Sequence, residues 1–127
     1  MIRLFAALSI PSEVGVKLQD RQMGIGGARW RPLDAFHVTL RFFGEIREDQ
    51  ARDLDEALLE VVARPFEIVL DGVGSFEDGG EASSVWAGVA ENTDLRRLAA
   101  SCERAARAAA WKAEPRRYRP HVTLAYL

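Results

Sequence analysis

The sequence predicts an α+β domain, and three observations support this class. Short apolar segments with the alternation typical of strands are interspersed with segments of clear helical periodicity. The chain has 127 residues, which suits one domain, and no linker or low-complexity stretch divides it. The tetrapeptide His-Val-Thr-Leu occurs twice, at 37–40 and 121–124. We therefore expect a bilobal, pseudo-twofold domain over 1–127, in which two small antiparallel sheets face a central groove and helices pack outside.

The N-terminal third is predicted to be a strand, a helix and a turn. Residues 2–10 form a short apolar run that fits a buried strand better than a signal peptide. Ser12 is expected to cap a helix that reaches about Met23. The glycines at 24–27 end this helix, and they predict a turn because they do not lie between a strand and a helix start. An extended piece at 28–31 then leads into the first His-Val-Thr-Leu segment.

The rest of the chain contains two stronger helices around a pair of strands. Helices are predicted over 48–63 and 94–110, since their apolar residues recur at helical spacing. Strands are predicted at 66–73 and 84–90, separated by the polar loop 77–81. The residues that we expect these helices to bury are Ala51, Leu54, Leu58, Val61 and Val62 in the first, and Leu95, Leu98, Ala99, Cys102, Ala105, Ala106 and Ala109 in the second.

Composition excludes several classes of function. The chain has 17 basic and 19 acidic residues and a formal net charge of −2, so no global attraction to nucleic acid is indicated and a phosphate would need a local basic patch. The single cysteine, Cys102, excludes an intramolecular disulfide and is expected to be a buried free thiol. No segment is long enough to span a membrane. We expect a soluble, cytoplasmic, monomeric protein.

Strand alternation gives each His-Val-Thr-Leu segment a polar and an apolar face. Burial of the apolar faces would fix the register, because a slip of one residue exchanges the two faces. Each strand should then present an imidazole and a hydroxyl on its other side. The predicted polar faces comprise His37, Thr39 and Arg41 in the first copy and Arg119, His121 and Thr123 in the second; the predicted apolar faces comprise Phe36, Val38, Leu40 and Phe42, and Pro120, Val122, Leu124 and Tyr126.

Two matched histidines suit substitution at phosphorus. One histidine in a strand is more often a surface or core residue, but two copies on matching faces favour a functional pair. Metal binding is a weaker alternative, because zinc takes three or four protein ligands and neither polar face adds a cysteine or carboxylate. In-line displacement at phosphorus needs a base on one side and an acid on the other. The threonine hydroxyls and Arg41 could hold the phosphate oxygens, and no metal or cofactor is required.

The paired motifs resemble those of a known superfamily. The two His-Val-Thr-Leu segments, the opening at Arg3–Leu8, the Phe42–Glu45 tail and the Tyr118–Pro120 lead-in are similar to the 2H phosphoesterases, and within them to the RNA 2′,3′-cyclic phosphodiesterases, also called 2′-5′ RNA ligases. The resemblance implies the bilobal fold. It also implies hydrolysis of 2′,3′-cyclic phosphate RNA ends to 2′-phosphates, with reversible 2′-5′ ligation in some members.

The resemblance also implies roles for individual residues. His37 would be the general acid, and His121 would be the general base that activates water. Thr39 and Thr123 would bind the phosphate. Many relatives carry an arginine where this sequence has Tyr126, so we expect Arg119 or Arg41 to compensate. Relatives also continue for several strands past the position of Leu127, so the domain is expected to lack C-terminal strands.

Two alternatives remain open at this stage. One keeps the chemistry but takes a small cyclic nucleotide as substrate, which the net charge of −2 fits slightly better than a long RNA. The other is a non-catalytic module that binds RNA ends. In each case the expected partner is RNA or a nucleotide that carries a 2′,3′-cyclic phosphate. Competition by oligoribonucleotides against mononucleotides distinguishes an RNA substrate from a small cyclic nucleotide. Binding without turnover identifies the non-catalytic module.

Overall fold

Six strands, three α-helices and one short 3-10 helix account for the secondary structure of the computed structural model, which describes residues 1–127. The α+β class is therefore confirmed. The strands are β1 (Ile2–Ser9), β2 (Arg29–Trp30), β3 (His37–Ile46), β4 (Leu70–Asp78), β5 (Glu81–Val89) and β6 (His121–Tyr126). The helices are α1 (Ser12–Gln19), α2 (Glu48–Leu58), α3 (Thr93–Ala108) and the 3-10 helix η1 (Leu33–Ala35). None of the helices is both long enough and apolar enough to cross a membrane.

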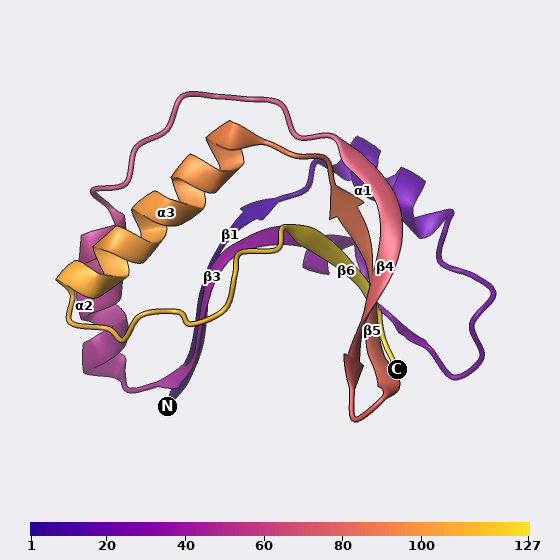
Figure 1. Ribbon diagram of the computed structural model, residues 1–127, viewed down its shortest axis with the longest axis horizontal. Coiled ribbons are helices and arrows are strands. Elements are labelled where there is room, and N and C mark those ends of the chain that lie inside the picture. The colour runs from indigo at the N-terminus through magenta and orange to yellow at the C-terminus, as the bar shows by residue number, and fades with distance from the viewer. The chain divides into compact units, whose positions relative to one another are not determined.

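The strands hydrogen-bond in one sheet rather than in the two small sheets predicted. Their order is β1-β3-β6-β5-β4 (Figure 1). In addition, β2 pairs with β6. The reason for the difference is that the two His-Val-Thr-Leu strands are direct neighbours. β3 and β6 run antiparallel, and Val38 lies opposite Val122, its equivalent in the repeat.

The chain divides into two compact units, each built from three segments. Unit 1 comprises residues 1–7, 39–68 and 91–119. Unit 2 comprises residues 8–38, 69–90 and 120–127, and it contains both histidines.

The hydrophobic core of unit 1 is formed by residues of β3, α2 and α3. Its fully or nearly buried members are Phe43, Ile46, Leu54 and Ala106, and partly buried residues such as Trp111 pack against them. The Phe43 and Trp111 rings meet edge to face, with centroids 6.0 Å apart. The two helices α2 and α3 contact one another in this unit.

Both helices of unit 1 were predicted, and the bounds of α3 differ from the predicted ones by one or two residues. The side chain of Asn92 caps α3 by accepting a hydrogen bond from the backbone N–H of Leu95 (2.9 Å). The buried positions of α3 are Leu95, Ala99, Cys102 and Ala106, four of the seven predicted, and the buried free thiol is confirmed. The other three predicted positions are half-buried. In contrast, α2 ends at Leu58, five residues early. Beyond this point Val62, predicted to face inward, is 88% exposed.

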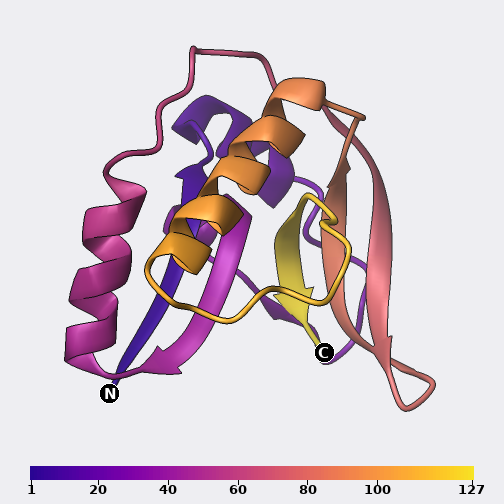
Figure 2. The ribbon, with the colours of Figure 1, turned by 60° about the vertical axis from the view of Figure 1, so that its left-hand side comes forward.

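Unit 2 contains a hairpin of β4 and β5 with β6 beside β5 (Figure 2). Both strands of the hairpin extend into the segment predicted as a polar loop, and the connection shrinks to Gly79 and Gly80. These glycines have φ of +63° and +86°, the left-handed conformations that a two-residue hairpin turn requires. The predicted loop is therefore a tight turn.

Helix α1 is also shorter than predicted and is not capped by Ser12. Pro11 occupies the cap position, and its carbonyl accepts hydrogen bonds from the backbone N–H groups of Val14 (3.0 Å) and Gly15 (2.9 Å). Gly15 is buried against Leu33 and Phe36, where a Cβ atom would overlap the Leu33 side chain. The absence of a side chain at Gly15 thus lets α1 approach η1 closely.

Arg41 is not on the polar face predicted for it. Leu40 and Arg41 are both buried, which breaks the alternation of β3 after the fourth residue of the motif. The Arg41 side chain is only 7% exposed and makes an ion pair with Glu103 at 2.6 Å. Its other nitrogens donate to the carbonyl oxygens of Phe42 (2.8 Å) and Lys112 (2.7 Å). Arg41 is therefore a structural residue of unit 1.

Replacing Arg41 with glutamine should lower the free energy of unfolding by about 3 kcal/mol, since it leaves the Glu103 carboxylate without its charged partner. Urea denaturation followed by circular dichroism measures this loss. The matched control is Arg52→Gln on the exposed side of α2, which should change stability by less than about 0.5 kcal/mol. Equal losses in the two variants would contradict the structural role.

Candidate functional site

One face of the unit 2 sheet carries His37, His121 and Thr123. Val38 and Val122 are paired and fully buried, at 0% exposure, so their strands direct the flanking residues to the opposite face. Continuing this antiparallel register by one residue places His37 opposite Thr123. On β5, Gly88 lies opposite His121 and Trp86 lies opposite Thr123. We call this surface the histidine face.

The two His-Val-Thr-Leu strands repeat the same burial pattern. In each, the valine, the leucine and the residue after the leucine are buried, while the histidine and threonine are half-buried. The sixth residue is exposed in both copies, Phe42 by 42% and Tyr126 by 39%. These two aromatic residues were predicted to be on the apolar face, so this prediction was wrong for both.

A β-bulge explains the change of face in β6. Val85 lies opposite Ala125 and Trp86 lies opposite Thr123, so Leu124 has no partner on β5. The extra residue turns Ala125 into the core and returns Tyr126 to the face of Thr123. Tyr126 thereby joins the histidine face instead of the hydrophobic core.

Two aromatic rings surround the imidazole of His121. The Phe76 ring meets it edge to face, with centroids 4.9 Å apart, and the Trp86 ring lies at 5.8 Å. Trp86 packs directly on Gly74, where a Cβ atom would collide with the indole. Its Nε1 is buried without a hydrogen-bond partner. Trp86 thus forms a wall beside His121.

Electrostatics connect His37 to its neighbours on this face. Burial is the main reason that the pKa of His37 lies below its usual value of 6.5. The positive charge of Arg31 and the charge of His121 lower this pKa further, while a hydrogen bond with the backbone of Ala35 opposes the change. His37 and His121 therefore interact electrostatically.

The remaining predicted site residues lie in unit 1. Thr39 is half-buried, and its carbonyl oxygen accepts a hydrogen bond from the Tyr118 hydroxyl (2.8 Å). Arg41 is held by Glu103 and by backbone carbonyls. Arg119 is exposed and lies two residues before His121. The structure therefore groups His37, His121 and Thr123 in one unit, but does not group Arg41 with them.

Arg31 is a residue of the histidine face that our sequence reasoning missed. Its guanidinium carbon lies 5.4 Å from the centroid of the Tyr126 ring. A signal was present, since Trp30-Arg31-Pro32 precedes the first motif as Tyr118-Arg119-Pro120 precedes the second. We considered Arg119 but not its counterpart.

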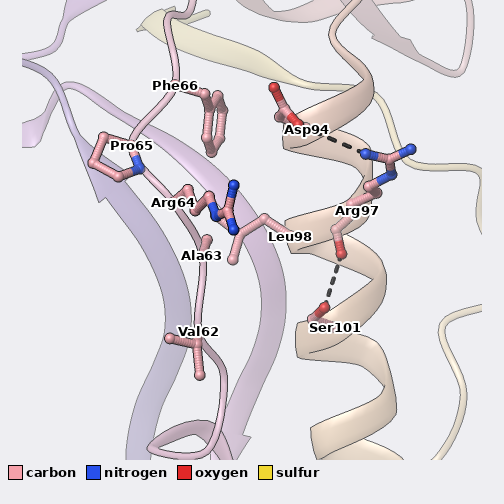
Figure 3. Close-up of a pocket in the computed structure, with 9 residues that line it drawn as sticks. All are labelled: Val62, Ala63, Arg64, Pro65, Phe66, Asp94, Arg97, Leu98 and Ser101. Atoms are coloured by element: carbon pink, nitrogen blue, oxygen red, sulfur yellow. Dashed lines mark hydrogen bonds and ion pairs between the residues drawn. The ribbon is translucent and has the colours of Figure 1, made fainter.

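A pocket of about 340 Å³ lies in unit 1, between the exposed segment 62–66 and helix α3 (Figure 3). Its polar groups are largely engaged with one another. Asp94 and Arg97 form an ion pair at 3.9 Å, and the Ser101 hydroxyl donates to the Arg97 carbonyl (3.0 Å). No histidine lines this pocket. No group of three or more histidine, cysteine, aspartate and glutamate residues has the arrangement of a metal site. We therefore assign the candidate site to the histidine face.

Comparisons with known proteins agree with the motifs. The family model of the 2′-5′ RNA ligase superfamily matches residues 16–127. The protein named RNA 2′,3′-cyclic phosphodiesterase from Archaeoglobus fulgidus is 35% identical over 103 residues, which are 79% of this chain and 58% of the relative. The protein of the same name from Aeropyrum pernix is 37% identical over 91 residues, 71% of this chain and 52% of the relative. The chain thus matches just over half the length of these curated relatives.

Solved structures show the same fold. TT0787 of Thermus thermophilus superposes with a TM-score of 0.82 and 28% sequence identity, over 98% of this chain and 74% of TT0787. E. coli LigT, crystallised with 3′-AMP, superposes with a TM-score of 0.78 over 98% of this chain and 72% of LigT. At 23% identity, the likeness to that LigT structure concerns the fold alone.

Replacing Tyr118 with phenylalanine removes the hydrogen bond to Thr39 and should cost about 1 kcal/mol near neutral pH. The loss should shrink in alkali. Burial raises the pKa of Tyr118 to about 12 from 10.0, so the unfolded chain deprotonates first and wild-type stability falls between these two values. Urea denaturation at about pH 9 and about pH 11 tests this prediction, because phenylalanine cannot contribute to the loss. An identical pH dependence in the two proteins would contradict it.

Proposed function

We propose that this chain, which belongs to the 2′-5′ RNA ligase superfamily, hydrolyses the 2′,3′-cyclic phosphate ends of RNA to 2′-phosphates by a metal-independent mechanism. The observation that carries the proposal is the pairing of the two His-Val-Thr-Leu strands, with Val38 opposite Val122. This register directs both histidines to one face, where the charge of His121 acts on His37. The bilobal arrangement around a central groove, which the resemblance implies, forms part of the same proposal.

The proposed reaction is an in-line displacement at phosphorus. His121 accepts a proton from a water molecule, whose oxygen attacks the phosphorus and forms the new P–O bond. The bond between phosphorus and the 3′ oxygen breaks, and His37 donates its proton to this leaving oxygen. The product carries a 2′-phosphate and a free 3′-hydroxyl. Proton exchange with solvent returns His37 to its protonated state and His121 to its neutral state.

The threonines of the two motifs would bind the phosphate during this step. Thr123 lies on the histidine face, two residues from His121 on the same strand, and Thr39 has the equivalent place two residues from His37. Hydroxyl donors directed at the non-bridging oxygens stabilise the charge that develops there. Arg41 is not part of this set, because its guanidinium is occupied by Glu103 and by backbone carbonyls. Arg119 remains a proposed contact for the phosphate.

The lowered pKa of His37 has a consequence for its role as the acid. Near neutral pH the free protein holds His37 mainly in its neutral form, because burial and nearby positive charges disfavour the imidazolium. A bound cyclic phosphate carries a negative charge, which favours the imidazolium form of His37. Substrate binding and protonation of His37 are therefore coupled, and the acid is charged when the phosphate is in place.

Incubating the protein with RNA that carries a 2′,3′-cyclic end, in the presence of EDTA, should yield a 2′-phosphate end. Mass spectrometry and 31P NMR identify the product. His37→Ala and His121→Ala should each lower kcat/KM by about 10²–10⁴-fold while the fold is retained. Formation of a 3′-phosphate, or turnover that EDTA abolishes, would contradict the mechanism. Binding without turnover of any cyclic phosphate would instead identify an RNA-end binding module, and preference for mononucleotides would identify a small-nucleotide enzyme.

The pH dependence of kcat/KM should report the lowered pKa of His37. Since the acid must be protonated in the free protein, kcat/KM should fall on the alkaline side with an apparent pKa below 6.5. The corresponding apparent pKa for kcat should be higher, because the bound phosphate favours the imidazolium. Steady-state rates across about pH 5 to 8 test this order. A higher apparent pKa in kcat/KM than in kcat would contradict the coupling.

A further inference from the structure

The backbone of Arg31 is fixed beside the second motif. In β2, Arg29 lies opposite Tyr126 and Trp30 lies opposite Ala125. The backbone N–H of Arg31 then donates to the carbonyl oxygen of Leu124 (2.8 Å). The Gln22 side chain donates to the carbonyls of Arg31 (2.9 Å) and Leu124 (3.1 Å), which fastens the two chain segments together. Arg31 is therefore held next to the strand that carries Thr123 and His121.

The side chain of Arg31 is directed to the histidine face by Tyr126. On β5, Ser84 lies opposite Tyr126 and Trp86 lies opposite Thr123, so Tyr126 and Thr123 share one face. The guanidinium carbon of Arg31 is 5.4 Å from the Tyr126 ring centroid, within the range of a cation–π contact. A guanidinium in such a contact can still donate hydrogen bonds through its N–H groups.

Arg31 differs from the arginines of this chain that have an acidic partner. Arg41 pairs with Glu103, Arg47 with Asp49, Arg96 with Glu91 and Arg116 with Glu114. Arg31 makes no ion pair, although it is half-buried. Its charge acts on His37 instead. A half-buried cation with no anionic partner, on the face that carries the two histidines, is suited to an anionic ligand.

We propose that Arg31 is a phosphate-binding residue of this site, held in orientation by the Tyr126 ring. Its in-plane N–H groups would donate to the two non-bridging oxygens of the cyclic phosphate, while the threonine hydroxyls complete the set of donors. The expected effect of Arg31 on catalysis rests on the proposed function, whereas its expected binding of a phosphate anion does not. The ring of Tyr126 acts through Arg31 and is a positioning residue.

The experiment compares Arg31→Gln, Arg31→Lys and Tyr126→Leu with Arg21→Gln. Arg21 is an exposed arginine of the same unit and makes no ion pair, so it matches the loss of charge. Three measurements are made on each protein. They are the affinity for inorganic phosphate by calorimetry, kcat/KM for 2′,3′-cyclic AMP, and the pKa of His37 from the NMR shift of its imidazole protons.

Arg31→Gln should weaken phosphate binding about 10-fold and lower kcat/KM about 10²–10³-fold, the range for loss of one preorganised donor. The pKa of His37 should rise in this variant, since one of its positive neighbours is gone. Arg31→Lys keeps the charge but not the planar fork, so it should restore the His37 pKa without restoring kcat/KM fully. Tyr126→Leu should lower kcat/KM while leaving the charge in place. Arg21→Gln should change every measurement by less than about twofold.

Phosphate affinity in Arg31→Gln equal to that in Arg21→Gln would overturn the proposal, whatever the activity. If the wild type turned over no cyclic phosphate, the proposed function would fail, and phosphate affinity together with the His37 pKa would still decide the role of Arg31. If Arg31→Gln does not fold, the phosphate affinities of Arg31→Lys and Tyr126→Leu test the proposal instead. Unchanged phosphate affinity in both of these folded variants would count against the proposal.

Discussion

The pairing of Val38 with Val122 is the contact on which the candidate site depends. Both valines are fully buried, and burying a side chain of this size contributes about 1.5–3 kcal/mol. Because strand side chains alternate, anchoring these two residues in the core directs the histidines and threonines beside them to the opposite face. The pair also joins equivalent positions of a repeat, so His37 has Thr123 of the other copy as its cross-strand neighbour by register. A buried hydrophobic contact thus determines the geometry of a polar site.

The break in strand alternation after each His-Val-Thr-Leu motif affects which side chains reach each face as much as the regular alternation within the motif does. In β6 a bulge at Leu124 moves Tyr126 out of the core and onto the histidine face. In β3 the equivalent change buries Arg41 and exposes Phe42, whose ring lies 5.3 Å from the Arg3 guanidinium carbon. Tyr126 has the corresponding contact with Arg31 at 5.4 Å. The two copies therefore share an exposed aromatic ring with a stacked arginine as well as the histidine and threonine.

Sequence reasoning found the parts that follow from periodicity and from the repeat. The stripe of α3, the buried thiol of Cys102, and the burial of Val38 and Val122 all follow from the spacing of apolar residues. The bulge could not be predicted in this way, because nothing in His-Val-Thr-Leu-Ala-Tyr marks an extra residue in one strand. The prediction continued the strand alternation past the leucine of each motif. It therefore assigned Arg41 to the polar face and Tyr126 to the core, and both assignments were wrong. The early end of α2 was missed for a different reason, since helical spacing cannot reveal that no partner covers Val62.

Arg41 and Arg31 show how surroundings rather than residue type decide function. Arg41 is nearly buried, and the acidic residue Glu103 lies at hydrogen-bond distance, so its charge is neutralised within the fold. Arg31 is held by backbone bonds and by a ring that offers no negative charge, so its charge is not neutralised by the protein. An uncompensated cation beside an imidazole disfavours a second positive charge, which is part of the reason that the pKa of His37 is low. An anion bound there would neutralise Arg31 and favour protonation of His37 together, so a group that opposes the acid form in the free protein would support it in the complex.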